Sequence, residues 1–119
     1  SLMQAVAKEY EYILENSDQG VYVYLDDTNK ICNKNFAQLL GYDSADEWAK
    51  IEESFPDVFV APESQETLIS SFLDTMEKCV TSTNKIVWKE KDGTTVDTTV
   101  ILAPISFDGH LLALHFVSM

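Results

Sequence analysis

The sequence predicts an α+β fold, because its helical and strand-like segments are segregated along the chain. Up to about residue 82, apolar residues recur mostly at helical spacing, apart from one strand pair early in the chain. After Thr83 the spacing changes to every second residue, which is typical of strands. Asp92-Gly93 and Asp108-Gly109 are hairpin turn signals, so the last three strands are expected to be antiparallel. The predicted order is one helix, two strands, several helices and three strands.

The first elements are a helix and a short strand pair. Apolar residues at helical spacing predict a helix over residues 3–16, which a polar breaker cluster ends. Residues 21–25 are a β-branched and aromatic run that predicts a strand. A turn at residues 26–29 and a return strand at residues 30–32 complete the pair.

Two short helices are predicted next. Asn33 is a good N-cap for a helix over residues 33–41, and Gly41 supplies the left-handed residue that ends it. Ser44, with a Glu three residues later, has the spacing of a capping box and begins a second short helix that carries Trp48.

The longest helix is predicted over residues 63–82. It follows residues 51–62, which are expected to be irregular or briefly helical because prolines limit a helix there. An apolar stripe should pack this helix on the sheet. The stripe is Ile69, Phe72, Leu73, Met76 and Val80, with Leu68 and Cys79 beside it.

Three strands are predicted in the last third of the chain. Residues 86–88 form the first, and alternation from Val96 gives a second strand that runs up to Pro104. The last strand covers residues 110–117 and is apolar on both faces. It is therefore expected in the centre of the sheet, covered on both sides.

The composition fits one domain and excludes two classes of partner. The chain has 119 residues, 45% of them hydrophobic, which is enough for one core. Its formal net charge is -12, and all eight basic residues are Lys. This charge repels nucleic acid and anionic membranes, and there is no Arg to hold a phosphate. Two cysteines and the absence of a secretion signal indicate a reducing, cytoplasmic compartment.

Three stretches in order resemble a PAS domain, and the resemblance covers about Glu11 to Met119. They are the strand and acidic turn Gly20–Asp27, the helix from Asn33 to Leu39-Leu40-Gly41-Tyr42, and the set Ser44, Glu47 and Trp48. The Asp92-Gly93 hairpin also lies where the family has one. The first hairpin departs from the family, which usually has a Gly in the turn and a longer second strand, so its register is left open.

The resemblance implies a five-stranded antiparallel sheet with helices packed on one face. We expect an N-terminal flanking helix over residues 1–16 and the PAS-like domain over residues 17–119. Members of the family are sensory or interaction modules in signalling proteins such as histidine kinases of two-component systems. Because the chain starts at Ser1 and stops in strand-like sequence, we expect a module excised from a larger protein, and Ser1-Leu2 could be a cloning scar.

Such domains hold a small pocket between helices and sheet. The apolar residues expected there could line a pocket or simply fill the core, and His115 could face the same space. Without Arg, a ligand should be neutral or apolar, not a phosphate or dicarboxylate. The candidates are Phe36, Leu40, Trp48, Phe59, Leu68, Phe72, Trp88, Val100 and His115.

The residues argue against cofactors, metals and catalysis. The family's flavin branch uses a Cys within an Asn-Cys-Arg motif, and its haem branch typically uses a His on the long helix; neither is found here. His110 and His115 are five apart in a strand and point to opposite faces. No nucleophile motif or calcium-loop spacing occurs. We expect no cofactor, no metal and no enzymatic activity.

The N-terminal helix carries an apolar stripe with near-heptad spacing. It could cover the outer sheet face of its own chain or pair with a second chain, and a homodimer is favoured. The interface candidates are Met3, Val6, Tyr10, Ile13 and Leu14.

The leading hypothesis is a sensory module that binds a small ligand or a protein partner and mediates dimerisation. The alternative is a purely structural dimerisation module with a filled core. A weaker alternative is a small cone-like α+β enzyme of the isomerase type, which needs a buried carboxylate. Asp97 is the only strand acid that could serve, and its Thr-Asp-Thr context indicates a solvent-facing residue.

Overall fold

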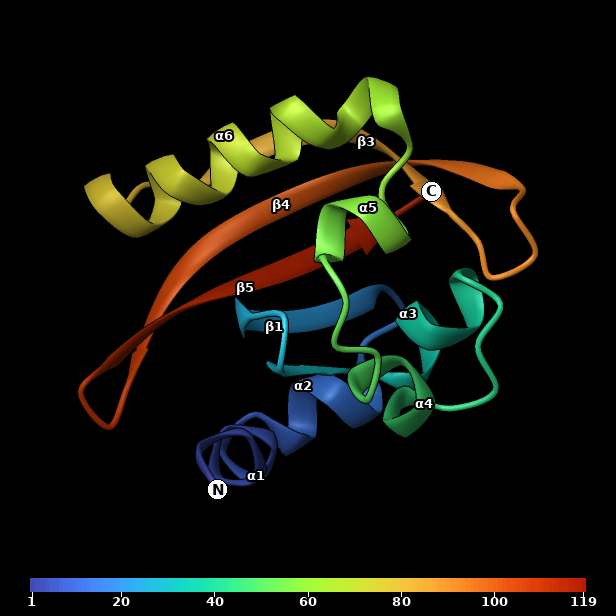
Figure 1. Cartoon of the computed structure of the whole chain (residues 1–119). Coiled ribbons are helices and arrows are strands. Elements are labelled where there is room, and N and C mark those ends of the chain that lie inside the picture. Colours follow the sequence, from blue (N-terminus) through green and yellow to red (C-terminus); the bar gives the residue numbers. More distant parts are fainter.

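Five strands form one antiparallel sheet in the order β2-β1-β5-β4-β3 in the computed structural model, which describes all 119 residues (Figure 1). This is the predicted α+β fold. The strands are β1 (Gly20–Asp26), β2 (Asn29–Cys32), β3 (Ser82–Lys89), β4 (Thr95–Phe107) and β5 (His110–Ser118). The helices are α1 (Leu2–Glu9), α2 (Glu11–Asn16), α3 (Lys34–Leu39), α4 (Ala45–Ala49), α5 (Phe55–Phe59) and α6 (Pro62–Lys78).

The central position of β5 confirms the prediction from its two apolar faces. Its inner face, with α3 to α6, belongs to the larger core cluster, which is strongly aromatic. Its outer face packs under α1 and α2 in a second, smaller cluster. Figure 1 shows α6 and the α1–α2 pair on opposite sides of the sheet. The small outer cluster is Val6, Val21, Val23, Leu112 and Leu114.

The N-terminal helix is broken, whereas the sequence predicted one helix over residues 3–16. Helix α1 ends at Glu9, because the backbone leaves helical geometry at Tyr10 (φ -102°, ψ 18°), and α2 begins at Glu11. Val6 on α1 and Leu14 on α2 both contact the outer cluster. The break lets two short helices follow the face of a twisted sheet that one straight helix would leave.

The predicted packing stripe of the long helix is right for Phe72, which packs against the core, and wrong for Ile69 and Leu73, which are exposed. The buried residues of α6 are Ser64, Leu68 and Thr75, while Ile69 and Leu73 are 43% and 47% exposed. Packing against β3 decides which face is buried, and the Ser64 hydroxyl accepts a hydrogen bond from the Val87 amide at 2.9 Å. A count of apolar positions cannot detect such an anchor.

Helix α6 is also shorter than predicted. It ends at Lys78, because Cys79 adopts a left-handed conformation (φ 53°). Val80, the last residue of the predicted stripe, therefore lies beyond the helix and is exposed.

Strands β3 and β4 are longer than predicted. Pairing with β4 recruits the polar residues 82–85 into β3. Strand β4 continues past Pro104 to Phe107 along β5. Its pairing with β3 stops at Leu102, so β4 is an edge strand at Pro104, where a residue without an N–H is tolerated.

The register of the first hairpin is set by the turn. Tyr22 pairs with Cys32 and Tyr24 with Lys30, and an irregularity follows before Asp26. The Asp26 carboxylate accepts hydrogen bonds from the Thr28 and Asn29 amides. This carboxylate stabilises a tight turn that contains no glycine.

Candidate functional site

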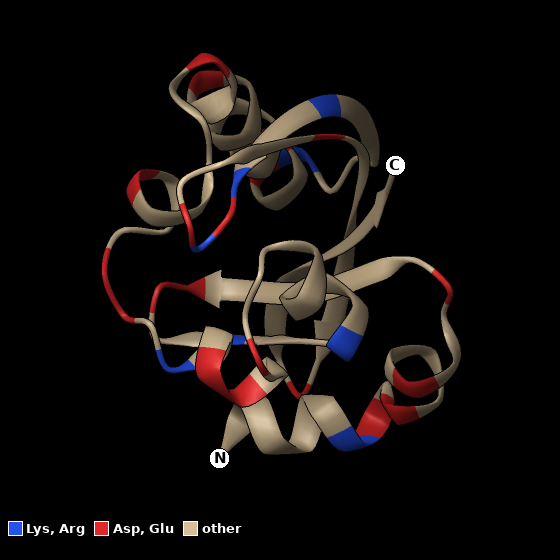
Figure 2. Cartoon of the chain, turned by 90° about the vertical axis from the view of Figure 1, so that its right-hand side faces the viewer, with Lys and Arg blue, Asp and Glu red and all other residues tan.

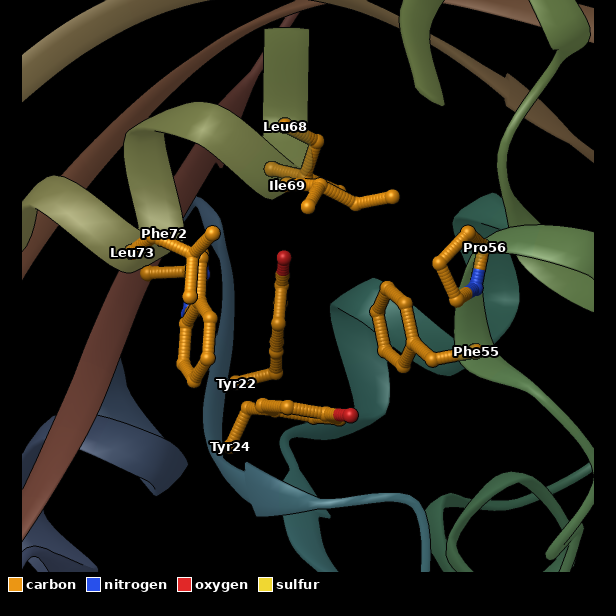
Figure 3. Close-up of a pocket in the computed structure, with 9 residues that line it drawn as sticks. Tyr22, Tyr24, Phe55, Pro56, Leu68, Ile69, Phe72 and Leu73 are labelled. Atoms are coloured by element: carbon orange, nitrogen blue, oxygen red, sulfur yellow. The ribbon is translucent and has the colours of Figure 1, made fainter. Parts of the chain in front are cut away.

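A cavity of about 240 Å³ lies between α5 and α6 on one side and β1 and β5 on the other (Figure 3). Most of its wall is hydrophobic. The nine lining residues are Tyr22, Tyr24, Phe55, Pro56, Leu68, Ile69, Phe72, Leu73 and His115.

Four parts of the fold place these side chains, and Phe55 and Pro56 come from the start of α5. Tyr22 and Tyr24 are two residues apart on β1 and therefore share its inner face. His115 is the direct partner of Tyr22 on β5. Helix α6 supplies four lining residues. Residues four apart on a helix lie on the same face, so these four form one face of α6: Leu68, Ile69, Phe72 and Leu73.

Tyr22 is the centre of the aromatic core. Its ring lies 4.6 Å from Phe36 and 3.8 Å from His115, measured between centroids, and both pairs are stacked. Its hydroxyl is buried and has no hydrogen-bond partner. Figure 3 shows this hydroxyl pointing toward Ile69 and Leu68 on α6. Burial raises the pKa of Tyr22 well above its usual value, so the hydroxyl keeps its proton. An unpaired buried hydroxyl costs about 1–3 kcal/mol.

Tyr24 has a partner for its hydroxyl. It donates a hydrogen bond to the Asp27 Oδ1 at 2.9 Å, and the same oxygen accepts from the Phe55 amide at 3.0 Å. Burial, together with this bonded carboxylate, raises the pKa of Tyr24. The Asp27 carboxylate thus ties the end of β1 to the start of α5 and fixes one wall of the cavity.

His115 is a neutral, fully buried ring. Its Nδ1 lies 3.1 Å from the Ala113 carbonyl oxygen, so Nδ1 carries the proton and donates it. Burial lowers the pKa of His115 to about 3. The imidazole therefore presents an uncharged surface to the cavity at neutral pH.

No charged side chain lines the cavity. The buried ammonium of Lys30 donates instead to the carbonyls of Asp27, Ala49 and Ile51. These bonds hold the segment between α4 and α5 onto β2, and burial lowers the pKa of Lys30. Lys30 is thus a structural residue.

The outer surface of the cavity is acidic. A shallow groove on α6 shares Ile69 and Leu73 with the cavity, and its wall includes Glu66, Asp74 and Glu77. Figure 2 shows acidic residues mostly on helices and loops, with few on the strands. A ligand that enters past Ile69 and Leu73 therefore crosses a negatively charged rim.

The structure brings three of the nine pocket candidates to the cavity: Leu68, Phe72 and His115. The other six do not line it, because they lie one layer deeper in the packed core, where each is completely buried. These six are Phe36, Leu40, Trp48, Phe59, Trp88 and Val100.

Sequence reasoning missed six lining residues. Tyr22 and Tyr24 could have been found from the alternation of β1, since residues two apart share a face. Ile69 and Leu73 were assigned to the core stripe of the long helix. Phe55 and Pro56 fall in a stretch without a periodic signal.

The N-terminal stripe covers the chain's own sheet. Val6 is fully buried in the outer cluster, and the other four interface candidates pack against it. Asp97, considered for an enzyme, is exposed on β4 and is not part of the cavity wall. None of the helices is long and apolar enough to cross a membrane.

Together these features define an α+β domain with a mainly apolar, partly open cavity between its helices and its antiparallel sheet. Neither a family model nor a curated protein matches the sequence. Solved structures match it closely in fold, and they are PAS domains, so the chain has the PAS fold.

Three similar structures illustrate the match. A PAS domain from a two-component sensor histidine kinase has a TM-score of 0.69 at 12% identity, with 96% of each chain covered. A PAS domain from Colwellia psychrerythraea has a TM-score of 0.68 at 20% identity, covering 100% of this chain and 98% of that one. A third, the PAS domain of a LuxR-family transcriptional regulator from Burkholderia thailandensis in complex with ethanol, has a TM-score of 0.67 at 13% identity, covering 92% and 96%.

Proposed function

We propose that this chain is the sensory module of a larger signalling protein and that it binds a small molecule in the cavity between α6 and β1. The observation that carries the proposal is the cavity itself, an apolar space with one unpaired hydroxyl in its wall. Similar structures include a domain of a sensor histidine kinase and a domain in complex with ethanol.

The sheet offers a route by which ligand binding could be transmitted. On β1, Tyr22 lines the cavity while Val21 and Val23 face the opposite side and contact the outer cluster with Val6 of α1. A displacement of β1 or β5 by a ligand therefore acts directly on the packing of the N-terminal helix. We propose this packing as the output, and the rest of the signalling protein as the partner that reads it.

The cavity supports a small ligand without a resident cofactor. Its volume of about 240 Å³ lies below the roughly 300–1,000 Å³ typical of pockets for drug-sized ligands. A flavin or a haem is at least as large as a drug-sized ligand, so we propose that the cavity holds neither. The wall also lacks a carboxylate, a thiol and a charged base, so we propose binding and not catalysis.

A homodimer and a reducing compartment complete the proposal. Helices α1 and α2 leave Ile101 of β4 37% exposed on the outer face, next to the half-buried Phe116. Such an apolar strip could support contact with a second copy. Neither Cys32 nor Cys79 is in a disulfide, which is in keeping with a cytoplasmic location.

The proposal is tested with the full chain purified under native conditions. Native mass spectrometry should detect a bound small molecule, and its mass should be lost in Ile69→Trp, which enlarges a side chain at the mouth of the cavity. Val80→Trp is the matched control, because Val80 is similarly exposed but does not line the cavity. If both variants retain the ligand, the ligand does not occupy this cavity and the proposed site is wrong. If only an unliganded dimer is found, the structural dimerisation module replaces this proposal.

A further inference from the structure

We propose that the ligand is a neutral, largely apolar molecule of about the size of a substituted benzene, with one hydrogen-bond acceptor that receives the proton of the Tyr22 hydroxyl. This inference rests on the proposed function and specifies the chemistry of its ligand. The hydrogen bond from the Tyr22 hydroxyl then determines the ligand specificity of the cavity.

The first argument is the unpaired donor. The Tyr22 hydroxyl is buried, points toward α6 and forms no hydrogen bond with any protein atom (Figure 3). Buried polar groups nearly always have a partner. Trp48 Nε1 and Thr75 Oγ1 are also unpaired, but neither residue lines the cavity, so the Tyr22 hydroxyl is the unpaired group that a bound molecule would satisfy. A protonated phenol donates to an acceptor such as a carbonyl, ether or hydroxyl oxygen.

The second argument is the contrast with Tyr24, the other phenol of the cavity. Its hydroxyl is bound to Asp27, whose same oxygen also holds the Phe55 amide. The other ring with polar atoms is His115, whose Nδ1 already donates a hydrogen bond to the Ala113 carbonyl oxygen. Tyr22 therefore provides the one free hydrogen-bond donor hydroxyl in the wall.

The third argument is charge. No lysine reaches the cavity, and Lys30 is held by three backbone carbonyls elsewhere. Glu66, Asp74 and Glu77 lie on the groove beside the entrance. A carboxylate or phosphate would be repelled at the rim and left without a counter-ion inside, where an unpaired charge is costly. A cation would find no carboxylate in the wall. A neutral ligand meets neither penalty.

The fourth argument is size and surface. An apolar protein cavity of about 150 Å³ holds benzene, and this cavity measures about 240 Å³. Five aromatic rings stand in its wall, those of Tyr22, Tyr24, Phe55, Phe72 and His115. Flat, weakly polar molecules with a single carbonyl or ether group fit such a space.

The test uses two probes of almost equal shape, acetophenone and α-methylstyrene. Acetophenone has a carbonyl oxygen at the position where α-methylstyrene has a methylene group. Binding is measured by NMR titration of the full chain, with benzoate as the anionic probe. We expect acetophenone to bind about tenfold more tightly than α-methylstyrene, as one buried hydrogen bond predicts, and benzoate to bind more weakly than acetophenone.

Two variants then assign the hydrogen bond. In Tyr22→Phe the affinity ratio of the two probes should fall to about one, while in the control Tyr12→Phe, which removes a hydroxyl from an exposed tyrosine of α2 outside the cavity wall, it should stay at the wild-type value. The inference is overturned by a ratio near one in the wild type, by a ratio that survives Tyr22→Phe, by benzoate as the tightest probe, or by no binding of any probe. Equal binding of the two neutral probes leaves the proposed function standing, so the two failures are distinguishable.

Discussion

Tyr22 and His115 stack face to face across the central strands β1 and β5, with ring centroids 3.8 Å apart and planes inclined by 11°. The stack joins the cavity wall to the middle of the sheet. It keeps an imidazole out of water, and it leaves the phenol hydroxyl at its far end without a partner. The chemistry of the cavity follows from this one pair.

The neutral His115 should make stability depend on pH. Burial lowers its pKa to about 3, from 6.5, so the unfolded chain takes up a proton as the pH falls through 6.5 and the folded chain does not. Its contribution to the free energy of unfolding therefore decreases from pH 6.5 down to about pH 3, by up to about 1.4 kcal/mol per pH unit. Urea unfolding at several pH values in this range measures the slope.

The substitution His115→Phe keeps an aromatic stack and removes the titrating group, so its slope should be shallower than that of the wild type. His110→Gln is the control, because His110 is exposed at the start of β5. If the free energy of unfolding of His115→Phe depends on pH as steeply as that of the wild type, His115 is not the group responsible.

The two cavity tyrosines should respond oppositely to loss of the hydroxyl in the ligand-free protein. Tyr22→Phe removes an unpaired buried group and should raise stability by about 1–3 kcal/mol. Tyr24→Phe breaks a hydrogen bond to a carboxylate and should cost about 1–3 kcal/mol. Chemical denaturation of both variants checks this, and a larger loss in Tyr22→Phe would refute it.

Lys30 should act as a structural clamp. Lys30→Met removes the donor of three hydrogen bonds to backbone carbonyls, and we expect a loss of about 1–3 kcal/mol. Hydrogen exchange should accelerate between α4 and α5. Lys50→Met, at an exposed position beside α4, should change neither quantity. Unchanged exchange in Lys30→Met would show that the clamp is not needed.

Asn33 should be the most sensitive polar residue of the first half of the chain. Its Oδ1 accepts from the amides of Val21 and Phe36, and its Nδ2 donates to the Gln19 carbonyl. Asn33→Ala leaves buried amides unpaired and should cost about 2–4 kcal/mol. Asn35→Ala removes one exposed hydrogen bond and should cost less than about 1 kcal/mol. Thermal and urea unfolding of both variants compare them, and equal losses would argue against this role.

Features coded by neighbouring residues were predicted from the sequence. Asn33 caps α3 as expected, with its side chain accepting from the Phe36 amide. The hairpin before β5 lies at Asp108-Gly109, where both residues have positive φ. The central place of β5 followed from its two apolar faces. These signals are local, because caps and turns involve residues a few positions apart and a strand's two faces are visible in its own alternation.

Features that depend on distant partners were not predictable. Pro104 is tolerated within β4 because the pairing of β4 with β3 stops at Leu102. No local sequence pattern reveals where that pairing stops. The buried face of α6 follows the Ser64 contact with β3 and not the largest apolar stripe. Residues expected at the pocket, such as Trp48 and Trp88, instead fill the layer beneath it.

The sequence by itself determined the α+β class, the order of elements, the turns and caps, and the likeness to PAS domains. Only the tertiary structure decided that Tyr22 would face a cavity with a free hydroxyl while Tyr24, two residues later, would be bound to Asp27. The reason is physical: both side chains obey the same strand periodicity, but whether a buried hydroxyl finds a partner depends on which segments pack against it.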